Sequence, residues 1–435
     1  MPLEPSASVP LPHEPSASVP LPHEPSASVP LQNEPSASVP LQNEQSASAP
    51  LPRVLWSLLF GNFVIGTGVM VVPGTLNDIS SNLQVSVPVA GQLITAAAVV
   101  MCVGAPLCAT LVAGWDRRRL LALALLWYGV FLLASACMPD FGSLLAVRVL
   151  AAIAPAIFTP QAASCINLLV APEQRGRAIT FVFMGWSVAS VVGMPLGAWI
   201  GGTLGWRVAF GAVALLSLVS AAWVWRSMPD GVRPPALSRA AWGQTLRSPA
   251  LMLCVAVTVL FAAGQFVLFS YFAPYFKQQL QFSAVDLSLL FAWFGAFGFI
   301  GNMLMSRNID RSGAPRAVMW SVGAMALSLL LWPLATNVLL AAIIILPWGL
   351  GCFASNSAQQ ARLAGIAPAL ASASIALNSS AMYAGQAMGA ASGGWLIAQG
   401  RMLDLHWFGL AALLAAMLVS WWASRQTVDL ALARG

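Results

Sequence analysis

The sequence predicts an all-α membrane protein with twelve transmembrane helices in two pseudo-symmetric six-helix bundles, and with both termini in the cytoplasm. Composition is the first observation behind this prediction: 58% of the residues are hydrophobic and 8% are charged, with a mean hydropathy of +0.78. A soluble domain carries about one quarter charged residues, so this chain has too little polar surface to face water. The other two observations are the length of the apolar runs and the sorting of the cations between them.

The first 52 residues differ in composition from all that follows. From Glu4 a decapeptide recurs as EPSASVPLPH twice, EPSASVPLQN twice and EQSASAPLPR once, with no aromatic residue and no cation before Arg53. Nothing in this repeat can form a core, so we expect residues 1–52 to be a disordered tail. Docking of its glutamates onto the basic cytoplasmic loops is the alternative. The tail has neither the cationic start nor the apolar centre of a signal peptide.

Twelve apolar runs, bounded by charge, Pro or Gly, follow this tail. Each is near or above the roughly 20 residues that a helix needs to cross the hydrocarbon layer of a membrane. Strands of a membrane barrel would instead alternate polar and apolar residues over about ten positions, which excludes that fold. The expected crossings are 54–76, 90–113, 120–138, 142–170, 179–201, 208–225, 250–275, 287–305, 317–336, 338–361, 371–397 and 405–423.

The cations between the runs are sorted by side. If the N-terminus is cytoplasmic, 16 of the 20 Lys and Arg residues fall on the cytoplasmic side, and Arg207, Lys277 and Arg401 fall on the other. An inserted protein with many crossings keeps its cations cytoplasmic. The basic residues are spread over separate loops and form no single basic face, so we expect no nucleic-acid partner. The remaining cation, Arg148, lies inside a run.

The longest polar gap after the tail divides the runs six and six. It predicts bundles at 53–225 and 250–425, a cytoplasmic linker at 226–249 and a cytoplasmic tail at 426–435. Two six-helix halves joined by a linker are typical of secondary transporters built from repeats, whose site lies between the halves near the middle of the membrane.

The crossings show no arrangement of residues that is typical of a catalytic or metal-binding site. The six cysteines show no metal-ligand spacing, and no run pairs a Ser or Cys nucleophile with His or a carboxylate. We therefore expect no cofactor, no metal and no enzymatic activity.

Motifs in both halves resemble those of a known family. Ala171 to Ala178 reads APEQRGRA, the fifth run contains Gly193, Pro195 and Gly197, and GWRVAF begins at Gly205. The second half repeats the pattern at Gln360, Arg362, Leu363, Ala367, Pro368, Asn378, Gly385, Gly389, Gly393 and Gly394. Over residues 54–423 the chain resembles the twelve-helix efflux permeases of the major facilitator superfamily, described as drug or sugar exporters. The resemblance implies a monomeric transporter.

Charges and glycines at helix ends and interfaces are the residues that this resemblance connects with gating. The family's cytoplasmic motif is partly present as Asp116 and Arg117, and its second copy as Asp310 and Arg311; the family uses such charges as latches between helix ends. The alternative is that they are solvated charges that set topology.

The glycine spacing permits two interpretations. Gly193, Pro195 and Gly197 in the fifth run, and Gly385, Gly389 and Gly393 in the eleventh, form small-residue stripes on corresponding helices. Small side chains let two helices approach closely or slide. The symmetric placement favours a rocking interface between the halves, and close packing alone is the other interpretation.

In the family the central cavity is lined mostly by helices one, four, seven and ten, which here carry few polar residues. A mostly apolar cavity with a few orienting polar groups suits a small neutral or amphipathic compound. The expected substrate-binding residues are Asn62, Thr67, Arg148, Gln161, Gln265, Tyr271, Asn356, Gln359 and Asn378, with Tyr383 and Gln386 as further contributors. Helix packing is the competing interpretation for each one.

Arg148 is the residue of greatest interest in this set. It lies about seven residues, or roughly 10 Å, inside the outer end of the fourth helix, where an unpaired cation costs a few kcal/mol. It matches an Arg that the family associates with proton coupling or with bracing helix four against helix one. The best available carboxylate is Asp78, which we assign to coupling or gating. No run has an acid in its middle, so the family's usual proton coupling is in doubt here.

We therefore expect an exporter of a small neutral or amphipathic organic compound in the bacterial inner membrane, working by alternating access. Its partners are the substrate and the lipid bilayer, with protons left open. The alternatives are a sugar or metabolite facilitator without proton coupling, and a membrane sensor or scaffold that does not transport.

Overall fold

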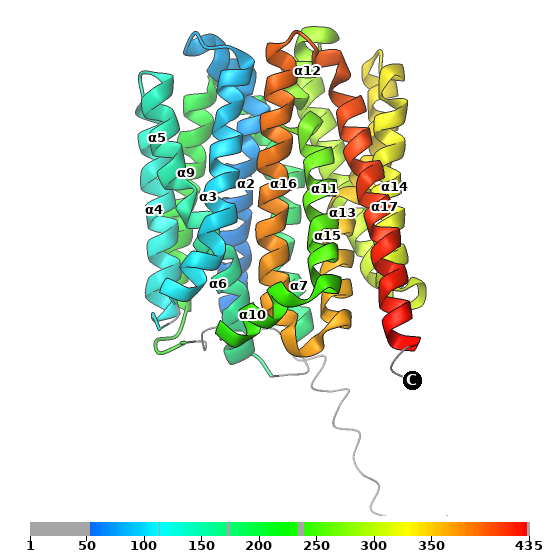
Figure 1. Ribbon diagram of the computed structural model, residues 1–435. Coiled ribbons are helices and arrows are strands. Elements are labelled where there is room, and N and C mark those ends of the chain that lie inside the picture. The colour runs from blue at the N-terminus through cyan, green and yellow to red at the C-terminus, as the bar shows by residue number, and fades with distance from the viewer. Residues whose placement is uncertain (1–52, 113, 172–174, 234–238, 433–435) are drawn as a thin grey trace, which may run out of the picture. The chain divides into compact units, whose positions relative to one another are not determined.

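The computed structural model describes residues 53–112, 114–171, 175–233 and 239–432. In these ranges the chain is helical throughout, without a strand, and the long helices run alongside one another (Figure 1). The decapeptide repeats at 1–52 and residues 172–174 of the loop that reads APEQRGRA lie outside the described residues.

Each half of the chain contributes a series of helices. The first half contains α2 (Val54–Asn82), α3 (Val87–Leu111), α4 (Arg117–Cys137), α5 (Phe141–Ala151), α6 (Ile153–Leu169), α7 (Arg175–Val188), the π-helix η2 (Ala189–Gly193), α8 (Met194–Leu204) and α9 (Trp206–Ser227). The second half contains α11 (Pro249–Phe269), α12 (Phe272–Gln279), α13 (Ala284–Ser312), α14 (Ala314–Leu331), η3 (Trp332–Leu334), α15 (Val338–Ile366), η4 (Pro368–Leu370), α16 (Ala371–Ala398), η5 (Met402–Asp404) and α17 (Leu405–Leu432).

The described chain is a multi-pass membrane protein. Eleven of its helical segments are long and apolar enough to cross a membrane, and they agree with eleven of the expected runs to within a few residues at most boundaries. The expected run at 371–397 forms α16, but its Ser, Asn, Gln and Gly content keeps it below the hydropathy of the other eleven. α16 nonetheless packs along α3 and α11 (Figure 1).

Four of the expected crossings break or change helix type near a proline; in the ninth, this happens close to the end, where α14 passes into η3 at Trp332 and Pro333. The fourth is divided at Ala152 between α5 and α6, close to Pro155; the fifth contains the π-helix η2 directly before Met194 and Pro195. The seventh breaks at Ser270 and Tyr271, between α11 and α12, and Pro274 follows. Proline has no N–H to donate to the preceding turn, so the regular helical hydrogen bonding is disturbed there. The breaks place Arg148 and Tyr271 beside irregular backbone.

The linker region is partly helical. α9 extends to Ser227, and the nine-residue helix α10 (Arg239–Arg247) lies within the expected linker of 226–249 and packs against α11 and α16. At the other end of the sequence, α17 continues to Leu432 through most of the expected tail at 426–435.

The two ends of the helix bundle differ in charge, and we name them accordingly. The Arg-rich end carries α10, the start of α4 and the end of α13; the Arg-poor end carries the start of α5 and helix α12 (Figure 1). The two halves meet along α3 with α16 and along α8 with α13.

Candidate functional site

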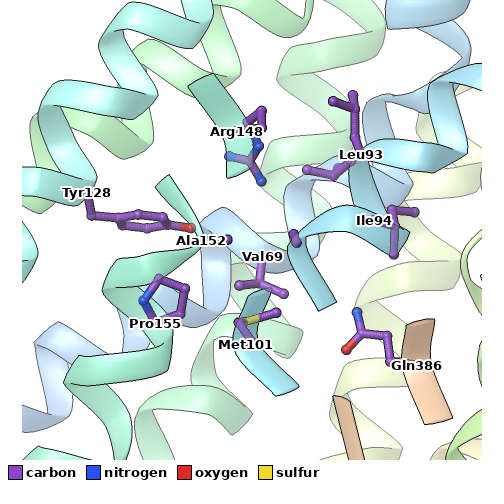
Figure 2. A pocket seen from close by; sticks show the side chains of 11 residues that line it. Val69, Leu93, Ile94, Met101, Tyr128, Arg148, Ala152, Pro155 and Gln386 are labelled. Carbon is purple, nitrogen blue, oxygen red and sulfur yellow. The ribbon is translucent and has the colours of Figure 1, made fainter. Parts of the chain in front are cut away.

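Arg148 lies in a small cavity formed mainly by helices of the first half. α5 positions this side chain, which is 4% exposed, so that its guanidinium faces the cavity (Figure 2). The space open to the centre of a water molecule is about 20 Å³, enough for one or two waters. The lining residues are Val69, Val72, Leu93, Ile94, Ala97, Met101, Tyr128, Arg148, Ala152, Pro155 and Gln386, of which Gln386 on α16 belongs to the second half.

The guanidinium of Arg148 makes few polar contacts. Its Nη2 donates to the carbonyl oxygen of Gly68 on α2 at 3.4 Å, and its Cζ lies 5.0 Å from the centre of the Phe210 ring. Its Nε and Nη1 are buried without a hydrogen-bond acceptor. The hydroxyl of Tyr128 is within electrostatic reach but makes no hydrogen bond of normal geometry. The cation is therefore only partly compensated.

Asp78, the expected carboxylate partner, does not pair with Arg148 in this structure. The ion pairs among the described residues are Arg118 with Asp230 and Arg401 with Asp404, both at 2.6 Å. Asp78 lies near the Arg-poor end of α2, close to the backbone N–H of Trp206 and in the field of Lys277. One of its oxygens is buried without a hydrogen-bond donor.

The second half has apolar residues where the first half has this polar group. Arg148 is the eighth residue of α5, and the eighth residue of α15 is Ile345. Tyr128 is the twelfth residue of α4, and the twelfth residue of α14 is Met325. Both counterparts are buried. The fold therefore packs the corresponding helices without a cation, so packing alone does not require Arg148.

Asn62 belongs to a hydrogen-bond network inside the first half. Its Oδ1 accepts from the Thr159 hydroxyl at 2.8 Å, and its Nδ2 donates to the carbonyl oxygen of Val182 at 3.2 Å. Trp186 Nε1 donates to the Thr159 oxygen at 3.4 Å. These bonds join α2, α6 and α7, and Asn62 is fully buried.

Asn378 and Asn356 form the corresponding network in the second half. The Thr258 hydroxyl donates to Asn378 Oδ1 at 2.6 Å, and Asn378 Nδ2 donates to Asn356 Oδ1 at 2.9 Å. These bonds join α11, α15 and α16, which correspond to the first, fourth and fifth of the runs expected in their half. Both networks use the same three helices of a half, and each binds those helices to one another.

The other expected binding residues are also buried, and most have partners within their own half. The Thr67 hydroxyl donates to the Phe63 carbonyl oxygen, the Gln359 amide donates to the Cys254 carbonyl oxygen, and the Tyr271 hydroxyl donates to the Ala390 carbonyl oxygen. Gln161 Oε1 accepts from Ser164 at 3.5 Å. Gln161 and Gln265 are 4% and 6% exposed. Of the expected binding residues, Arg148 and Gln386 line the cavity described above.

The glycine stripes pack within the halves. A Cβ at Gly193 or Gly197 would overlap Thr67 or Val71 on α2, and Pro195 lies between them on α8. On α16, a Cβ at Gly385, Gly389 or Gly393 would overlap the backbone of α11. Both stripes therefore bring two helices of the same half together. Close approaches between the halves occur elsewhere, at Gly91 against Tyr271 and at Gly295 against the backbone of Ser190.

Asp116 and its neighbours fasten the start of α4 to the segment that follows α9. Asp116 accepts from the backbone N–H groups of Arg118, Arg119 and Gly231, at 3.0, 3.3 and 2.6 Å, and Arg118 pairs with Asp230. Burial raises the pKa of Asp116, but these N–H groups outweigh burial and lower the pKa below its ordinary value.

The other expected gating charges have different surroundings. Arg117 is buried and donates to the carbonyl oxygens of Val112 and Trp115. Arg311 is exposed at the end of α13, and the side chain of Asp310 lies outside the described part.

Sequence reasoning missed Tyr128, Met101 and Pro155 as neighbours of Arg148. In the sequence each of them looks like a packing residue inside an apolar run. They lie on three different helices, so the sequence does not show that they meet. Tyr128 could have been singled out, because the chain has four tyrosines and a tyrosine inside an apolar run needs a hydrogen-bond partner for its hydroxyl.

Comparison with known proteins identifies transporters over most of the chain. The family model of the Major Facilitator Superfamily matches residues 58–390. Inner membrane transport protein YdhP of Escherichia coli (strain K12) is 31% identical over 349 residues, covering 80% of this chain and 89% of that protein. A chloramphenicol resistance protein of Streptomyces lividans is 34% identical over 271 residues, covering 61% and 68%. The purine ribonucleoside efflux pump NepI of Salmonella paratyphi B is 30% identical over 285 residues, covering 63% and 69%.

A solved structure has the same fold. It is the crystal structure of a bacterial homologue of the human lysosomal transporter Spinster, in an inward-facing and unoccupied conformation. The similarity has a TM-score of 0.69 at 16% identity and covers 86% of this chain and 97% of the other.

Proposed function

The chain belongs to the major facilitator superfamily, and we propose that it exports a small neutral or amphipathic organic compound by alternating access. The observation that carries this proposal is the cavity around Arg148. It is lined by helices of the first half and by Gln386 of the second, which is where a transporter of two repeats places its site.

We further propose that the chain crosses a bacterial inner membrane twelve times, with both termini in the cytoplasm. In this proposal α16 is the additional crossing that brings the eleven to twelve, because it packs along α3 and α11, and its small and buried polar residues face neighbouring helices and not lipid. The cytoplasmic side is the Arg-rich end, since 16 of the 20 cations follow that assignment. A relative named as an inner membrane transport protein supports the location.

The contacts within each half support movement of the halves as units. The networks around Asn62 and Asn378 each join three helices, and the glycine stripes hold α8 against α2 and α16 against α11. Rocking of one compact half against the other is the motion expected of repeat-built transporters. In this proposal Gly193, Pro195 and Gly197 stiffen the first half, and Asp116 holds its linker in place.

The site and the relatives together favour an uncharged substrate. The cavity is mostly apolar, and no acid lies in the middle of a crossing to attract a cationic drug. Two relatives are named for chloramphenicol resistance and for purine ribonucleoside efflux. We propose Arg148 as a residue that contacts the transported compound, and members of the two networks as residues that hold the surrounding helices.

Proton coupling is the open part of this proposal, and a facilitator without coupling is the second candidate. The facilitator is favoured because Arg148 pairs with no carboxylate among the described residues. An arginine that stays charged cannot take up and release the proton by itself. Flux into liposomes under an imposed pH gradient separates the two. Flux that follows the gradient and is lost in Asp78→Asn indicates coupling, and flux that ignores the gradient indicates a facilitator.

Transport itself is tested with purified protein in liposomes and a panel that includes chloramphenicol and purine ribonucleosides. The proposal predicts protein-dependent flux of at least one uncharged compound. Growth and metabolite profiling of a deletion strain extends the panel to compounds found in the cell. Saturable binding of a compound without any flux would contradict the proposal and indicate a sensor.

A further inference from the structure

We propose that the cavity around Arg148 binds one compact monovalent anion, either a halide ion or the carboxylate group of an organic molecule. This assignment requires only binding, so it does not depend on the proposed export function.

The polar groups around the cavity can all donate hydrogen bonds. The Nε and Nη1 atoms of Arg148 are buried without acceptors, and a guanidinium has donors only and keeps its charge in proteins. The Tyr128 hydroxyl is also buried without a hydrogen-bond partner of normal geometry, and the Gln386 side chain enters from the opposite side (Figure 2). None of the described residues that line the cavity is acidic. A guanidinium with two N–H groups left without acceptors, in a cavity whose other polar groups can also donate, suits an anion.

The apolar remainder of the lining strengthens this interpretation. Val69, Leu93 and Met101 surround the donors, so the local dielectric is low and an uncompensated cation is costly there. An anion beside the guanidinium would offset that cost and would accept hydrogen bonds from the unused N–H groups. Arg362 shows the contrast, because this buried arginine already donates to Ser420 and Ser424 at distances of 3.0 to 3.2 Å.

The size of the cavity limits what can enter. In this conformation a space of about 20 Å³ holds one or two waters, so it admits a single small ion or a carboxylate head group and excludes a bulky sulfonate. The larger compound proposed for export would enter only in another state of the cycle, when the halves have moved apart. The aromatic ring of Tyr128 lies directly against the backbone of Gly68, where a Cβ would overlap the hydroxyl. Gly68 thus lets the hydroxyl reach the cavity from α4.

Because Gln386 lies on the second half, a bound anion would connect the two halves of the chain. Arg148 and Tyr128 belong to the first half, whereas Gln386 belongs to α16 of the second. An anion held by all three connects the halves and stabilises the conformation in which they converge. For a protein that works by the proposed alternating access, anion occupancy would then favour one state of the cycle.

The test is the thermal unfolding of the purified full-length chain at constant ionic strength, with a bulky sulfonate exchanged stepwise for chloride, bromide, acetate or benzoate. We expect a saturable rise in the melting temperature with at least one of these anions. A response to halides alone identifies a free ion as the ligand, and a response to carboxylates alone identifies an organic carboxylate. A wild-type melting temperature that is the same in all five salts would overturn the proposal.

Variants assign the response to the site. Arg148→Gln should abolish it, and Gln386→Leu should weaken the apparent affinity about tenfold, since a hydrogen bond to a charged group is lost. Arg362→Gln is the matched control for a buried arginine and should keep the response even if the protein becomes less stable. If Arg148→Gln does not fold, Tyr128→Phe and Gln386→Leu must each weaken the response. An unchanged response in Arg148→Gln, or in either of the other two variants, would contradict the assignment.

Discussion

The Nη2 atom of Arg148 lies 3.4 Å from the carbonyl oxygen of Gly68, and this contact is the one hydrogen bond of normal geometry that the guanidinium makes within the described chain. A buried cation held by one long bond to a backbone carbonyl and by the face of Phe210 is poorly compensated. A side chain in this condition is a cost to stability, and its presence indicates function.

Replacing Arg148 by an apolar residue should therefore not destabilise the fold. We expect the melting temperature of Arg148→Leu to equal or exceed that of the wild type, because an uncompensated charge costs about 2.5 to 3.5 kcal/mol at a helix centre on insertion scales. Arg362→Leu, the control, should lower the free energy of unfolding by about 1 to 3 kcal/mol, because its bonds to α17 are lost. Melting of the two variants in one detergent makes the comparison, and destabilisation by Arg148→Leu as large as that by Arg362→Leu would contradict it.

The fit between Gly68 and Tyr128 can be measured by a double-mutant cycle. Gly68→Ala should cost about 1 to 3 kcal/mol, because its Cβ overlaps the hydroxyl and ring of Tyr128. Tyr128→Phe removes the hydroxyl, so the double variant should be more stable than the sum of the single changes predicts. Gly211→Ala, where a Cβ meets no atom within 4 Å, is the control and should be neutral or stabilising. Strict additivity in the cycle would show that the two residues do not press on each other.

The network in the second half should show coupling between its hydroxyl and amide groups. Thr258→Val and Asn378→Leu each leave a buried partner without its hydrogen bond, and the double variant should lose less than the sum. Double-mutant cycles inside membrane proteins give about 0.6 to 1.7 kcal/mol for such pairs, and we expect a coupling in that range. Unfolding of the four proteins measures it, and Thr159→Val with Asn62→Leu repeats the cycle in the first half.

Asp116 should make a contribution to stability that depends on pH in the acid range. Its pKa in the folded protein lies below the ordinary value of 3.8, so the carboxylate stabilises the fold above that value. The contribution is lost as pH falls through the lower, folded pKa. The difference in melting temperature between wild type and Asp116→Asn should thus be constant from pH 7 to pH 5 and shrink below about pH 4. A difference that grows as pH falls would contradict this.

The sequence predicted the fold through features that act on the whole chain. Run length depends on the membrane as a solvent, so eleven helices that are long and apolar enough to cross it lie within a few residues of the expected runs at most boundaries. The side assigned from loop charge and the six-and-six division stay predictions. The membership in the major facilitator superfamily, expected from short motifs, is confirmed. Breaks such as the one between α11 and α12 were not expected, because Tyr271 and its neighbours lie inside an unbroken apolar run.

The site was harder to predict, because sequence shows that a residue lies in a crossing but not which neighbour it faces. Contact of Asn62 and Asn378 with substrate stays a prediction; in this structure their amide oxygens accept hydrogen bonds from threonines of adjacent helices. The glycine spacing predicted a close helix contact, and the partner proved to be a helix of the same half. Arg148 was identified because an ionisable residue in an apolar run is costly whatever its neighbours are.

Transport by Arg148→Ala in liposomes tests the central claim most directly. The measurement is flux of a compound that the wild type transports, with the amount of inserted protein determined in the same vesicles. We expect normal insertion and flux reduced to the protein-free background, because Arg148 acts at the cavity and the fold does not require it. Flux at the wild-type rate with Arg148→Ala would contradict it.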